Sequence, residues 1–441
     1  MRYLFRPPAA EAATLLSLPW EQPLEEWDPD LLIDVPQRGI SRHVVRFTAS
    51  EGRVYALKEI PEPLARREYA LLTDFESEGL PAVSVLGICV DRPHAQQAVL
   101  VTRYLEYSMS YRYLFSSPRS LQAAGQLIDT LVELLVRLHL AGVFWGDCSL
   151  SNTLFRLDAG SFAAYLVDAE TAERHRSLSP GQRAYDVDLA QERVGGEMLD
   201  LQFGNLLPED IDPVEVAAGL PGRYEALWDE VTREEVFRLD EQRYRVAQRL
   251  QRLNDLGFDA GEVELITSPE GARLRVDTQV AEPGHHRREL FRLTGLEVQE
   301  KQARRLLNDL RSFRAYLEQS GGRPVPESVA GHRWLAEVYQ PVVEAVPPAL
   351  VGRLAPAEVF HEVLEHRWFL SERAGRDVGT TAAARSYFDT VLPGTSPELT
   401  TPSALVDRGR GQMVPGVGAV GAPRDAGAAP GGQVPVAPDP R

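Results

Sequence analysis

Hydrophobic residues near the start of the chain occur in short, strand-like runs. Two of these runs, 44–48 and 54–60, flank a brief turn and predict a β-hairpin. A helix is expected to follow them and to end near 79–81, where Gly and Pro interrupt the pattern. Two further β-rich runs, 82–90 and 98–105, are expected to be strands. The pattern therefore predicts a small sheet with one helix packed against it.

The middle of the chain changes to helical periodicity. Leucines recur at helical spacing over 121–140, and the charged residues among them favour a helix over a membrane span. Two strands are expected around a turn at 158–161. Beyond them, Asp186, Asp188 and Glu192 are expected to open a further helix.

Beyond a proline-rich stretch, the pattern is again mostly helical. We expect a long amphipathic helix over 224–256 and then a hairpin formed by 262–266 and 273–280. Three more helices are expected near 297–318, 331–345 and 356–373.

These patterns predict an α+β chain in five parts. The parts are an N-terminal extension (1–30), a small sheet-and-helix lobe (31–106), a mainly helical lobe (107–212), a mostly helical domain with a β-hairpin (213–392) and a tail (393–441). The tail is rich in Pro, Gly and Ala and has almost no aromatic residues, so it is expected to be disordered.

The composition restricts the class of protein. The chain has 441 residues, of which 44% are apolar and 25% are charged, as in ordinary soluble proteins. Its net charge of −17 argues against binding to nucleic acid or to anionic membranes. Cys89 and Cys148 are too few for a disulfide framework. With no apolar run at the N-terminus and no transmembrane segment, a cytoplasmic location is expected.

Lysine is rare, with two lysines against 45 arginines, and one of the two is Lys58 on a predicted strand. Lysine presents a compact charge where arginine presents a broad fork, which suits a narrow cleft that contacts phosphate oxygens. Ala56 lies on the same face of the strand and leaves room for a purine ring. A carboxylate is needed to hold the lysine extended; Glu68 is the best candidate, with Glu62 and Glu76 as alternatives.

A second group of polar residues follows the 121–140 helix. Asn152 stands five residues after Asp147, and Asp168 closes the apolar run 162–167. Asp147 can accept the proton of an attacking hydroxyl or orient it, while Asn152 and Asp168 offer oxygen atoms to Mg²⁺.

The ordered set of strand lysine, Asp-x4-Asn loop and strand-end Asp resembles the protein-kinase-like superfamily over 31 to about 205. The Gly-Asp form of the loop is most similar to lipopolysaccharide (Kdo/heptose) kinases and to aminoglycoside or choline phosphotransferases. This resemblance implies a bilobal fold that uses ATP and Mg²⁺. It implies that Lys58 contacts the α- and β-phosphates and pairs with Glu68, that Asp147 is the catalytic base, and that Asn152 and Asp168 bind the metal.

The resemblance extends to further positions. Leu105 and Glu106 would belong to a hinge that pairs with the adenine edge, and Asp188 would anchor the catalytic loop from below. No G-x-G-x-x-G precedes Lys58, so Gly39 is the nearest candidate for a phosphate-covering loop. The second half resembles a domain of unknown function that accompanies such kinase-like domains in high-GC bacteria.

The favoured function is an ATP- and Mg²⁺-dependent kinase acting on a non-protein hydroxyl, such as that of a glycan, a lipid-linked sugar or another small molecule. Only 19 residues separate Asp168 from Asp188, which leaves little room for a protein-substrate platform. One alternative is a pseudokinase or nucleotide-sensing scaffold that binds a protein partner through its C-terminal half. Another is an atypical protein Ser/Thr kinase.

Two features of the C-terminal half are expected to be structural. The basic stretch 284–314 is predicted to be a solvated face, with a dock for an anionic substrate or for the acidic first half as the alternative. His361 and His366 are five residues apart and lie on different helix faces, so they are not expected to bind zinc together.

Overall fold

The computed structural model describes residues 1–5, 9–35, 42–50, 52–93, 95, 97–115, 120–208, 211–233, 235–237, 262–268, 271–277, 285–321, 323–374, 376 and 378–395. Gly39 lies outside these ranges, as do residues 396–441 of the predicted tail. Within these ranges, no helix combines the length and the apolar character needed to cross a membrane.

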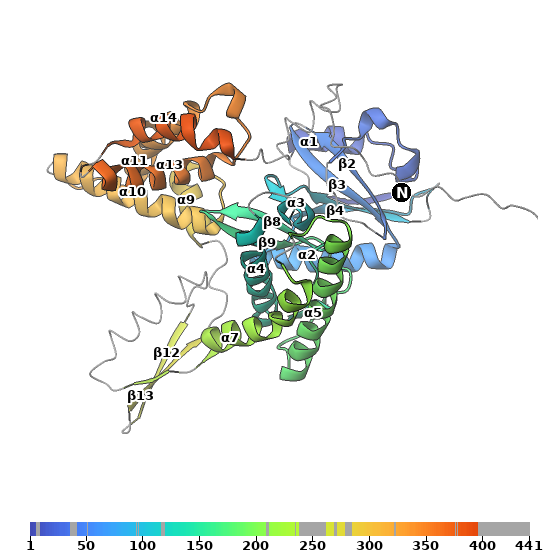
Figure 1. Ribbon diagram of the computed structural model, residues 1–441. Coiled ribbons are helices and arrows are strands. Elements are labelled where there is room, and N and C mark those ends of the chain that lie inside the picture. The colour runs from blue at the N-terminus through green and yellow to red at the C-terminus, as the bar shows by residue number, and fades with distance from the viewer. Residues whose placement is uncertain are drawn as a thin grey trace, which may run out of the picture.

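The first part of the chain forms a five-stranded antiparallel sheet with the order β1-β4-β5-β3-β2 (Figure 1). The strands are β1 (Arg2–Phe5), β2 (Val44–Ser50), β3 (Arg53–Ile60), β4 (Val85–Val90) and β5 (Ala98–Arg103). Helix α2 (Glu62–Glu78) packs on the sheet and ends at Gly79, whose φ of 63° is in the left-handed region that glycine tolerates. The predicted hairpin, helix and two strands are confirmed.

Residues assigned to an N-terminal extension belong to this sheet and its cover. Strand β1 pairs with β4, and three short helical segments follow, α1 (Ala9–Leu16), η1 (Leu24–Glu26) and η2 (Pro29–Leu31). Trp20 and Trp27 are buried against Tyr55 and Leu57 of β3. Arg92, also buried, donates hydrogen bonds to the carbonyl oxygen of Trp20 and to the carboxylate of Glu59, so the segment is fixed to the sheet.

Alternation along β3 determines where Lys58 lies. Successive residues of a strand point to opposite faces of the sheet. Tyr55 and Leu57 face the N-terminal segment, whereas Ala56 and Lys58 face a cleft on the other side, next to α2.

The mainly helical lobe is built around α4. Its helices are α3 (Tyr111–Phe115), α4 (Ser120–Leu140), α5 (Pro180–Phe203), α6 (Pro213–Ala218) and α7 (Leu220–Thr232). Its strands are β6 (Ser108–Met109), β7 (Val143–Phe144), β8 (Thr153–Asp158), β9 (Ser161–Leu166) and β10 (Glu173–Arg174). The predicted 158–161 turn joins β8 to β9.

Helix α5 begins earlier than expected. A capping box formed by Ser179 and Gln182 starts it at Pro180, so Asp186 and Asp188 lie in its interior and do not open it. The prediction of a helix start at Asp186 was therefore wrong, because acidic residues that favour a first turn also occur inside helices where they have hydrogen-bonding partners.

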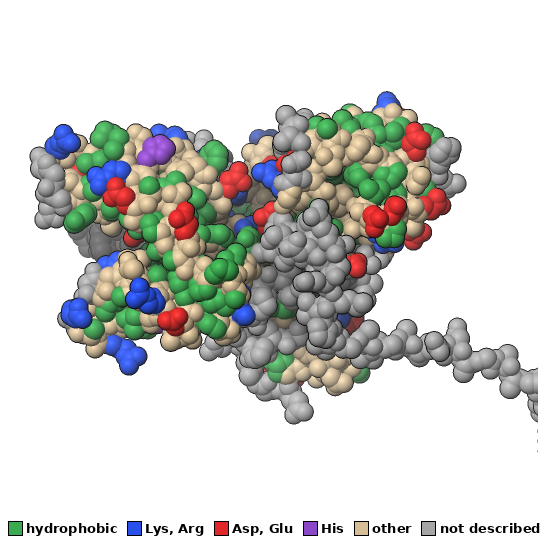
Figure 2. Space-filling view, turned by 90° about the horizontal axis from the view of Figure 1, so that it is seen from above, with side chains coloured by type: hydrophobic (Ala, Val, Ile, Leu, Met, Phe, Trp, Pro, Cys, Tyr) green, Lys and Arg blue, Asp and Glu red, His purple; other side chains and the backbone are tan. Residues whose placement is uncertain are grey.

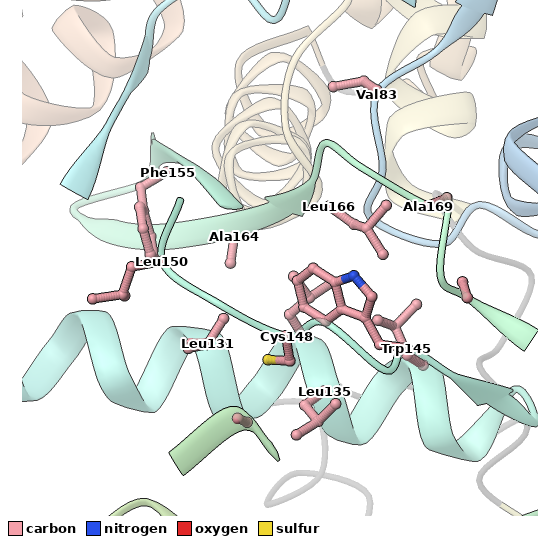
Figure 3. Packing of buried hydrophobic residues seen from close by; sticks show 14 of the residues in the cluster. Val83, Leu131, Leu135, Trp145, Cys148, Leu150, Phe155, Ala164, Leu166 and Ala169 are labelled. Atoms are coloured by element: carbon pink, nitrogen blue, oxygen red, sulfur yellow. The ribbon is translucent and has the colours of Figure 1, made fainter. Parts of the chain in front are cut away.

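Figure 3 shows the core beneath the 145–152 loop. Trp145, Cys148 and Leu150 of the loop are all buried and pack against Leu131 and Leu135 of α4, together with side chains of the β8–β9 hairpin. Cys148 is a small buried side chain. Because every second or third residue of the loop is anchored in the core, its polar residues are held in fixed directions.

The C-terminal half contains a small sheet and a separate group of helices. The sheet has the order β11-β13-β12, from β11 (Glu235–Phe237), β12 (Glu262–Ser268) and β13 (Gly271–Asp277). The helical segments are α9 (His285–Thr294), α10 (Glu300–Gly321), α11 (Glu327–Trp334), the π-helical η4 (Leu335–Tyr339), α12 (Gln340–Glu344), η5 (Pro348–Leu350), α13 (Pro356–Ala374), α14 (Thr380–Thr390) and η6 (Leu392–Gly394). Here "the helical domain" means 285–395.

Several predictions for this half need correction. The helix expected over 224–256 is interrupted after Thr232, because Arg233 is extended and Val236 pairs with β13. The part of this prediction over 238–256 lies outside the described residues. Helices α9 and α14 were not predicted. The expected disordered tail does not begin at Pro393, since η6 ends at Gly394 and Arg353 donates to the carbonyl oxygens of Pro393 and Thr395.

Candidate active site

A cleft of about 1130 Å³ lies between the small sheet and the helical lobe. Its walls contain Ala56, Lys58 and Leu105 from the sheet side. The opposite wall contains Asp147, Asn152 and Asp168, and Glu68 also contributes. The structure therefore brings together residues that are up to 112 positions apart in the chain.

Two further residues, Gly39 and Glu106, were predicted to contact the nucleotide. Gly39 lies outside the described residues. Glu106 is not among the residues that line the cleft, although its neighbour Leu105 and Tyr104 are. Burial raises the pKa of the half-buried Glu106 carboxyl, an effect that the guanidinium of Arg156 opposes.

Lys58 is surrounded by three carboxylates. Its Nζ lies 3.1 Å from Glu68 Oε2, 2.8 Å from Asp168 Oδ2 and 3.3 Å from Glu170 Oε2. Burial lowers the pKa of Lys58, but the charges of Glu68 and Asp168 overcome that effect and raise it. Lys58 therefore keeps its positive charge.

Glu68 is the carboxylate that pairs with Lys58 from α2. It is 1% exposed and also accepts a hydrogen bond from the backbone N–H of Ala169. The two alternatives have other surroundings: Glu62 pairs with Arg66, and Glu76 is exposed. Among the three candidates, only Glu68 meets the lysine.

The carboxylates around Lys58 exceed the positive charge available to them. Oxygen atoms of Glu68, Asp168 and Glu170 all lie within 4.8 Å of one another. Burial raises the pKa of Glu68 to about 7; Lys58 opposes this shift and Asp168 adds to it. Such an oxygen-rich, electron-rich cluster has the donor chemistry of a site for a hard divalent cation.

Asp147 is held by its own loop. The side-chain amide of Asn152 donates to Asp147 Oδ2 over 3.0 Å and to the Asp147 carbonyl oxygen over 3.1 Å. Arg193 Nε lies 3.2 Å from Oδ1, and Arg42 Nη2 lies 3.3 Å from Oδ2, both from largely exposed side chains. The carboxylate is oriented by Asn152 while remaining on the wall of the cleft.

The residue that anchors this loop from below is Asp186, not Asp188. Asp186 is fully buried and accepts hydrogen bonds from the N–H of Trp145 at 2.6 Å and of Gly146 at 2.8 Å, and it lies 3.0 Å from His139 Nε2. Asp188 is exposed. The two carboxylates are two positions apart on α5 and therefore face different sides of the helix.

Glu197 holds the other end of the loop and was not predicted. Its carboxylate accepts from the N–H of Leu150 at 2.7 Å and of Ser151 at 3.0 Å. Glu197 follows Asp186 by eleven residues, about three helical turns, which places both on one face of α5. That spacing was a signal in the sequence, and it shows that one helix carries both supports of the loop.

Glu170 was also missed as a member of the site. The sequence Asp168-Ala169-Glu170 departs from the kinase pattern of Asp-Phe-Gly, and the departure places a second acid two residues after the first. Besides Lys58, Glu170 contacts His43, with 2.9 Å between Oε2 and Nε2. The signal was the Asp-x-Glu spacing.

The basic stretch of the helical domain is partnered by acids. Arg311 pairs with Glu289, Arg314 with Glu318, and Arg305 with Glu365. The face of this domain that is seen from above, on the left of Figure 2, carries both Lys/Arg and Asp/Glu side chains. These ion pairs agree with the prediction that the basic stretch is a solvated face.

Two family models match the chain. Residues 46–193 match the lipopolysaccharide kinase (Kdo/WaaP) family, and residues 226–392 match a domain of unknown function, DUF4032. The chain matches no curated protein. A solved structure titled "WaaP in complex with acyl carrier protein" is 19% identical and covers 52% of this chain and 99% of its own, with a TM-score of 0.31.

The first match includes Lys58, Glu68, Asp147, Asn152 and Asp168, the residues that line the cleft together. The second match includes the whole of the helical domain up to Leu392. The chain therefore combines a protein-kinase-like domain, related in sequence to the lipopolysaccharide kinases, with an appended domain of unknown function.

Proposed function

We propose that the chain is an ATP- and Mg²⁺-dependent kinase that transfers phosphate to a hydroxyl of a sugar or of another non-protein small molecule. The observation that carries the proposal is the meeting of Lys58, Glu68 and Asp168 in one cleft with Asp147 and its loop. Phosphoryl transfer asks a protein mainly to position the reactants and to neutralise charge, and this set can do both. The sequence match to the lipopolysaccharide kinase family supports a sugar hydroxyl as the acceptor.

Each residue has a role that follows from its place. Lys58, held by the buried Glu68, would contact phosphate oxygens of the nucleotide. Ala56 and Leu105 line the part of the cleft next to the small sheet, where a purine ring would lie. Asp147 would accept the hydrogen bond of the acceptor hydroxyl and receive its proton.

The oxygen donors near Lys58 fit Mg²⁺. Asp168, Glu170 and the side-chain oxygen of Asn152 would hold the ion, since the amide nitrogen of Asn152 is already bound to Asp147. Once bound, Mg²⁺ would neutralise charge on the phosphates. Glu68 would stay with Lys58, because it is almost completely buried.

The cleft continues beyond Asp147 into a polar region suited to a small hydroxylated acceptor. This region lies between α3 and α5 and includes Tyr111, Arg112, Ser149, Glu192 and Asp200. Hydrogen-bond donors and acceptors of this kind can bind several hydroxyls of one sugar. Only the short β10 lies between Asp168 and the start of α5, which supports a small acceptor over a protein.

A nucleotide-sensing scaffold is the second candidate. It is favoured by the Ala169-Glu170 departure and by the crowding of Lys58 with three carboxylates. Turnover of ATP with sugar-containing acceptors, or with cell extract, separates the kinase from the scaffold.

The two cysteines are buried and free, which fits the reducing cytoplasm, where ATP is available.

Mg²⁺·ATP is expected to raise the melting temperature of the protein by several degrees. A ligand that binds only the folded state at about 100 times its Kd stabilises that state by about 2.7 kcal/mol. Asp168→Ala should remove the Mg²⁺ dependence of this shift, while Glu173→Ala on the exposed β10 should leave it intact. The absence of a shift in the wild-type protein at millimolar Mg²⁺·ATP would contradict both the kinase and the scaffold.

Mg²⁺ is expected to bind more weakly at about pH 6 than at about pH 8. The Glu68 carboxyl has a pKa of about 7, so below that pH the cluster holds a proton. A dication favours the ionised cluster, so its binding displaces the proton and is opposed by acid. Calorimetric titration of Mg²⁺ in the presence of ADP, in buffers of different ionisation enthalpy, measures the released proton.

The control for this pH dependence is Glu68→Gln, which removes the group that titrates. Its Mg²⁺ affinity should be flat over the same range of pH. A wild-type affinity that is also flat would show that Glu68 does not hold the proton.

A further inference from the structure

The β8–β9 hairpin connects the two ends of the proposed metal site. Strand β8 begins immediately after Asn152, and β9 ends two residues before Asp168. The strands pair in continuous register from Thr153 with Leu166 to Asp158 with Ser161. Any displacement of this hairpin would move both residues.

One side of this turn packs against the helical domain: Asp158 and Ala159 are buried, whereas Gly160 and Ser161 are exposed. In Figure 1 the outer ends of β8 and β9 reach toward α9 and α10. Asp158 is 3% exposed, and its two carboxylate oxygens accept from the backbone N–H groups of Gln302 at 2.7 Å and of Lys301 at 3.1 Å. A residue of the kinase-like domain thus satisfies the first turn of α10, which would otherwise have unpaired N–H groups.

The helical domain supplies the reciprocal contact through Glu358 of α13. This carboxylate is fully buried and accepts from the N–H of Ala159 at 2.9 Å and of Gly160 at 2.6 Å. It also accepts from Gln302 Nε2 at 2.7 Å. Ala159 and Gly160 have φ of 56° and 76°, and both turn N–H groups point to this one side chain.

Further contacts join the same two surfaces. Leu157 packs against the core of the helical domain, and the Tyr165 hydroxyl is hydrogen-bonded to the side-chain amide of Gln299. Lys301 Nζ lies 3.5 Å from Glu133 on α4, the helix that precedes the Asp147 loop.

The two buried carboxylates make this interface cost more free energy to form than an apolar packing surface would. Burial raises the pKa of Asp158 to about 6, an effect that Glu358 increases and the N–H groups of Gln302 and Lys301 oppose. Two buried carboxylates are poor stabilisers compared with apolar side chains of similar size. What they do supply is direction, since each carboxylate fixes two backbone N–H groups in one geometry.

We propose that the helical domain acts as a clamp on the β8–β9 hairpin, and that Glu358 and Asp158 are positioning residues that set Asn152 and Asp168 for metal-nucleotide binding. The proposal rests on the proposed function for the identity of that site. The hairpin transmits the position over its six-residue strands, about 20 Å at the usual rise per residue. The domain of unknown function is thereby a working part of the phosphotransfer site.

The test is the affinity of the full chain for Mn²⁺, used as a spectroscopic substitute for Mg²⁺, with ADP present. Glu358→Gln keeps the length of the side chain but places an N–H₂ group against N–H donors. We expect the Kd for Mn²⁺ to rise about 10- to 100-fold, as when supporting partners of metal ligands are removed. ADP affinity measured without metal should change less than twofold, because Ala56 and Leu105 lie on the small-sheet side. A purely structural role would weaken both or neither.

Two matched pairs of variants control the experiment. Glu365→Gln changes a half-exposed carboxylate on the same helix that pairs with Arg305 and should leave Mn²⁺ affinity unchanged. Gly160→Ala strains the clamped turn, where the added methyl lies 3.4 Å from His361 Nε2. Gly52→Ala introduces the same left-handed strain in the β2–β3 turn, where nothing lies within 4 Å.

The outcomes separate the clamp from the proposed function. If Glu358→Gln does not fold, the Mn²⁺ affinities of Gly160→Ala and Gly52→Ala are compared instead. Only Gly160→Ala strains the clamped turn. A folded clamp variant that binds Mn²⁺ and ADP like the wild type overturns the clamp and leaves the proposed function standing. A wild-type protein that shows no metal-dependent ADP binding overturns the proposed function, and the clamp with it.

Discussion

Lys58→Arg is expected to abolish phosphate transfer nearly as completely as Lys58→Met, with a loss of about 10²–10³-fold in ATP turnover, the usual effect of removing preorganised charge. The Nζ atom contacts three carboxylates at 2.8–3.3 Å, in a space shaped for a compact ammonium. A guanidinium is larger and projects a planar fork, so it would displace the nucleotide phosphates or Glu68. The measurement is ATP turnover, or the nucleotide-induced melting shift if the acceptor is not yet identified.

The matched control is the other lysine in the chain. Lys301 pairs with Glu133 through one contact of 3.5 Å, so Lys301→Arg should retain turnover. Both arginine variants should remain folded, because Lys58 reaches into a cleft and contributes little to core packing. An Lys58→Arg protein with wild-type turnover would remove the phosphate-binding role from this lysine.

Asp186→Asn is expected to reduce turnover by at least about 100-fold and to destabilise the protein by about 1–3 kcal/mol, the cost of leaving a buried polar group without its partner. The wild-type carboxylate receives two backbone N–H groups of the Asp147 loop and contacts His139, whose pKa is lowered by burial. An asparagine must turn its N–H₂ toward one of these donors, so the loop would shift. Turnover and thermal unfolding are the two measurements.

Asp188→Asn is the control for this prediction, on the same helix two residues away. Because Asp188 is exposed, its replacement should change stability by less than about 0.5 kcal/mol and leave turnover intact. Equal effects of the two variants would show that Asp186 does not support the loop. The comparison also decides between the residue inferred from the family pattern and the residue that makes the contacts.

The sequence was most informative where the signal was local. Lys58 with Ala56, and Asp147 with Asn152, are defined by spacing within one strand and one loop, and their relative order indicated that they share a cleft. Glu68 could be preferred over two other acids but not proved, since the choice depends on how α2 packs on the sheet.

Contacts between residues far apart in the sequence could not be predicted in this way. Choosing between Asp186 and Asp188 requires the rotation of α5 about its axis. This helix begins six residues before Asp186, at the capping box of Ser179. Glu358 meets Ala159 across 199 positions, and no periodicity within either segment indicates that contact. Helix α9 was not predicted, because its four consecutive His and Arg residues are equally typical of a charged surface.

The hydrogen-bonded turn between the two halves has a consequence for how such a chain can evolve. A recombination event that kept residues up to α7 and discarded the helical domain would leave Asp158 without the α10 N–H groups and would expose Leu157 to water. The reverse event would leave Glu358 without the N–H groups of Ala159 and Gly160. Neither half is therefore a domain that can be joined freely to unrelated domains. Descendants of this protein should therefore lose or retain both halves together, and substitutions at Asp158 and Glu358 should occur in pairs.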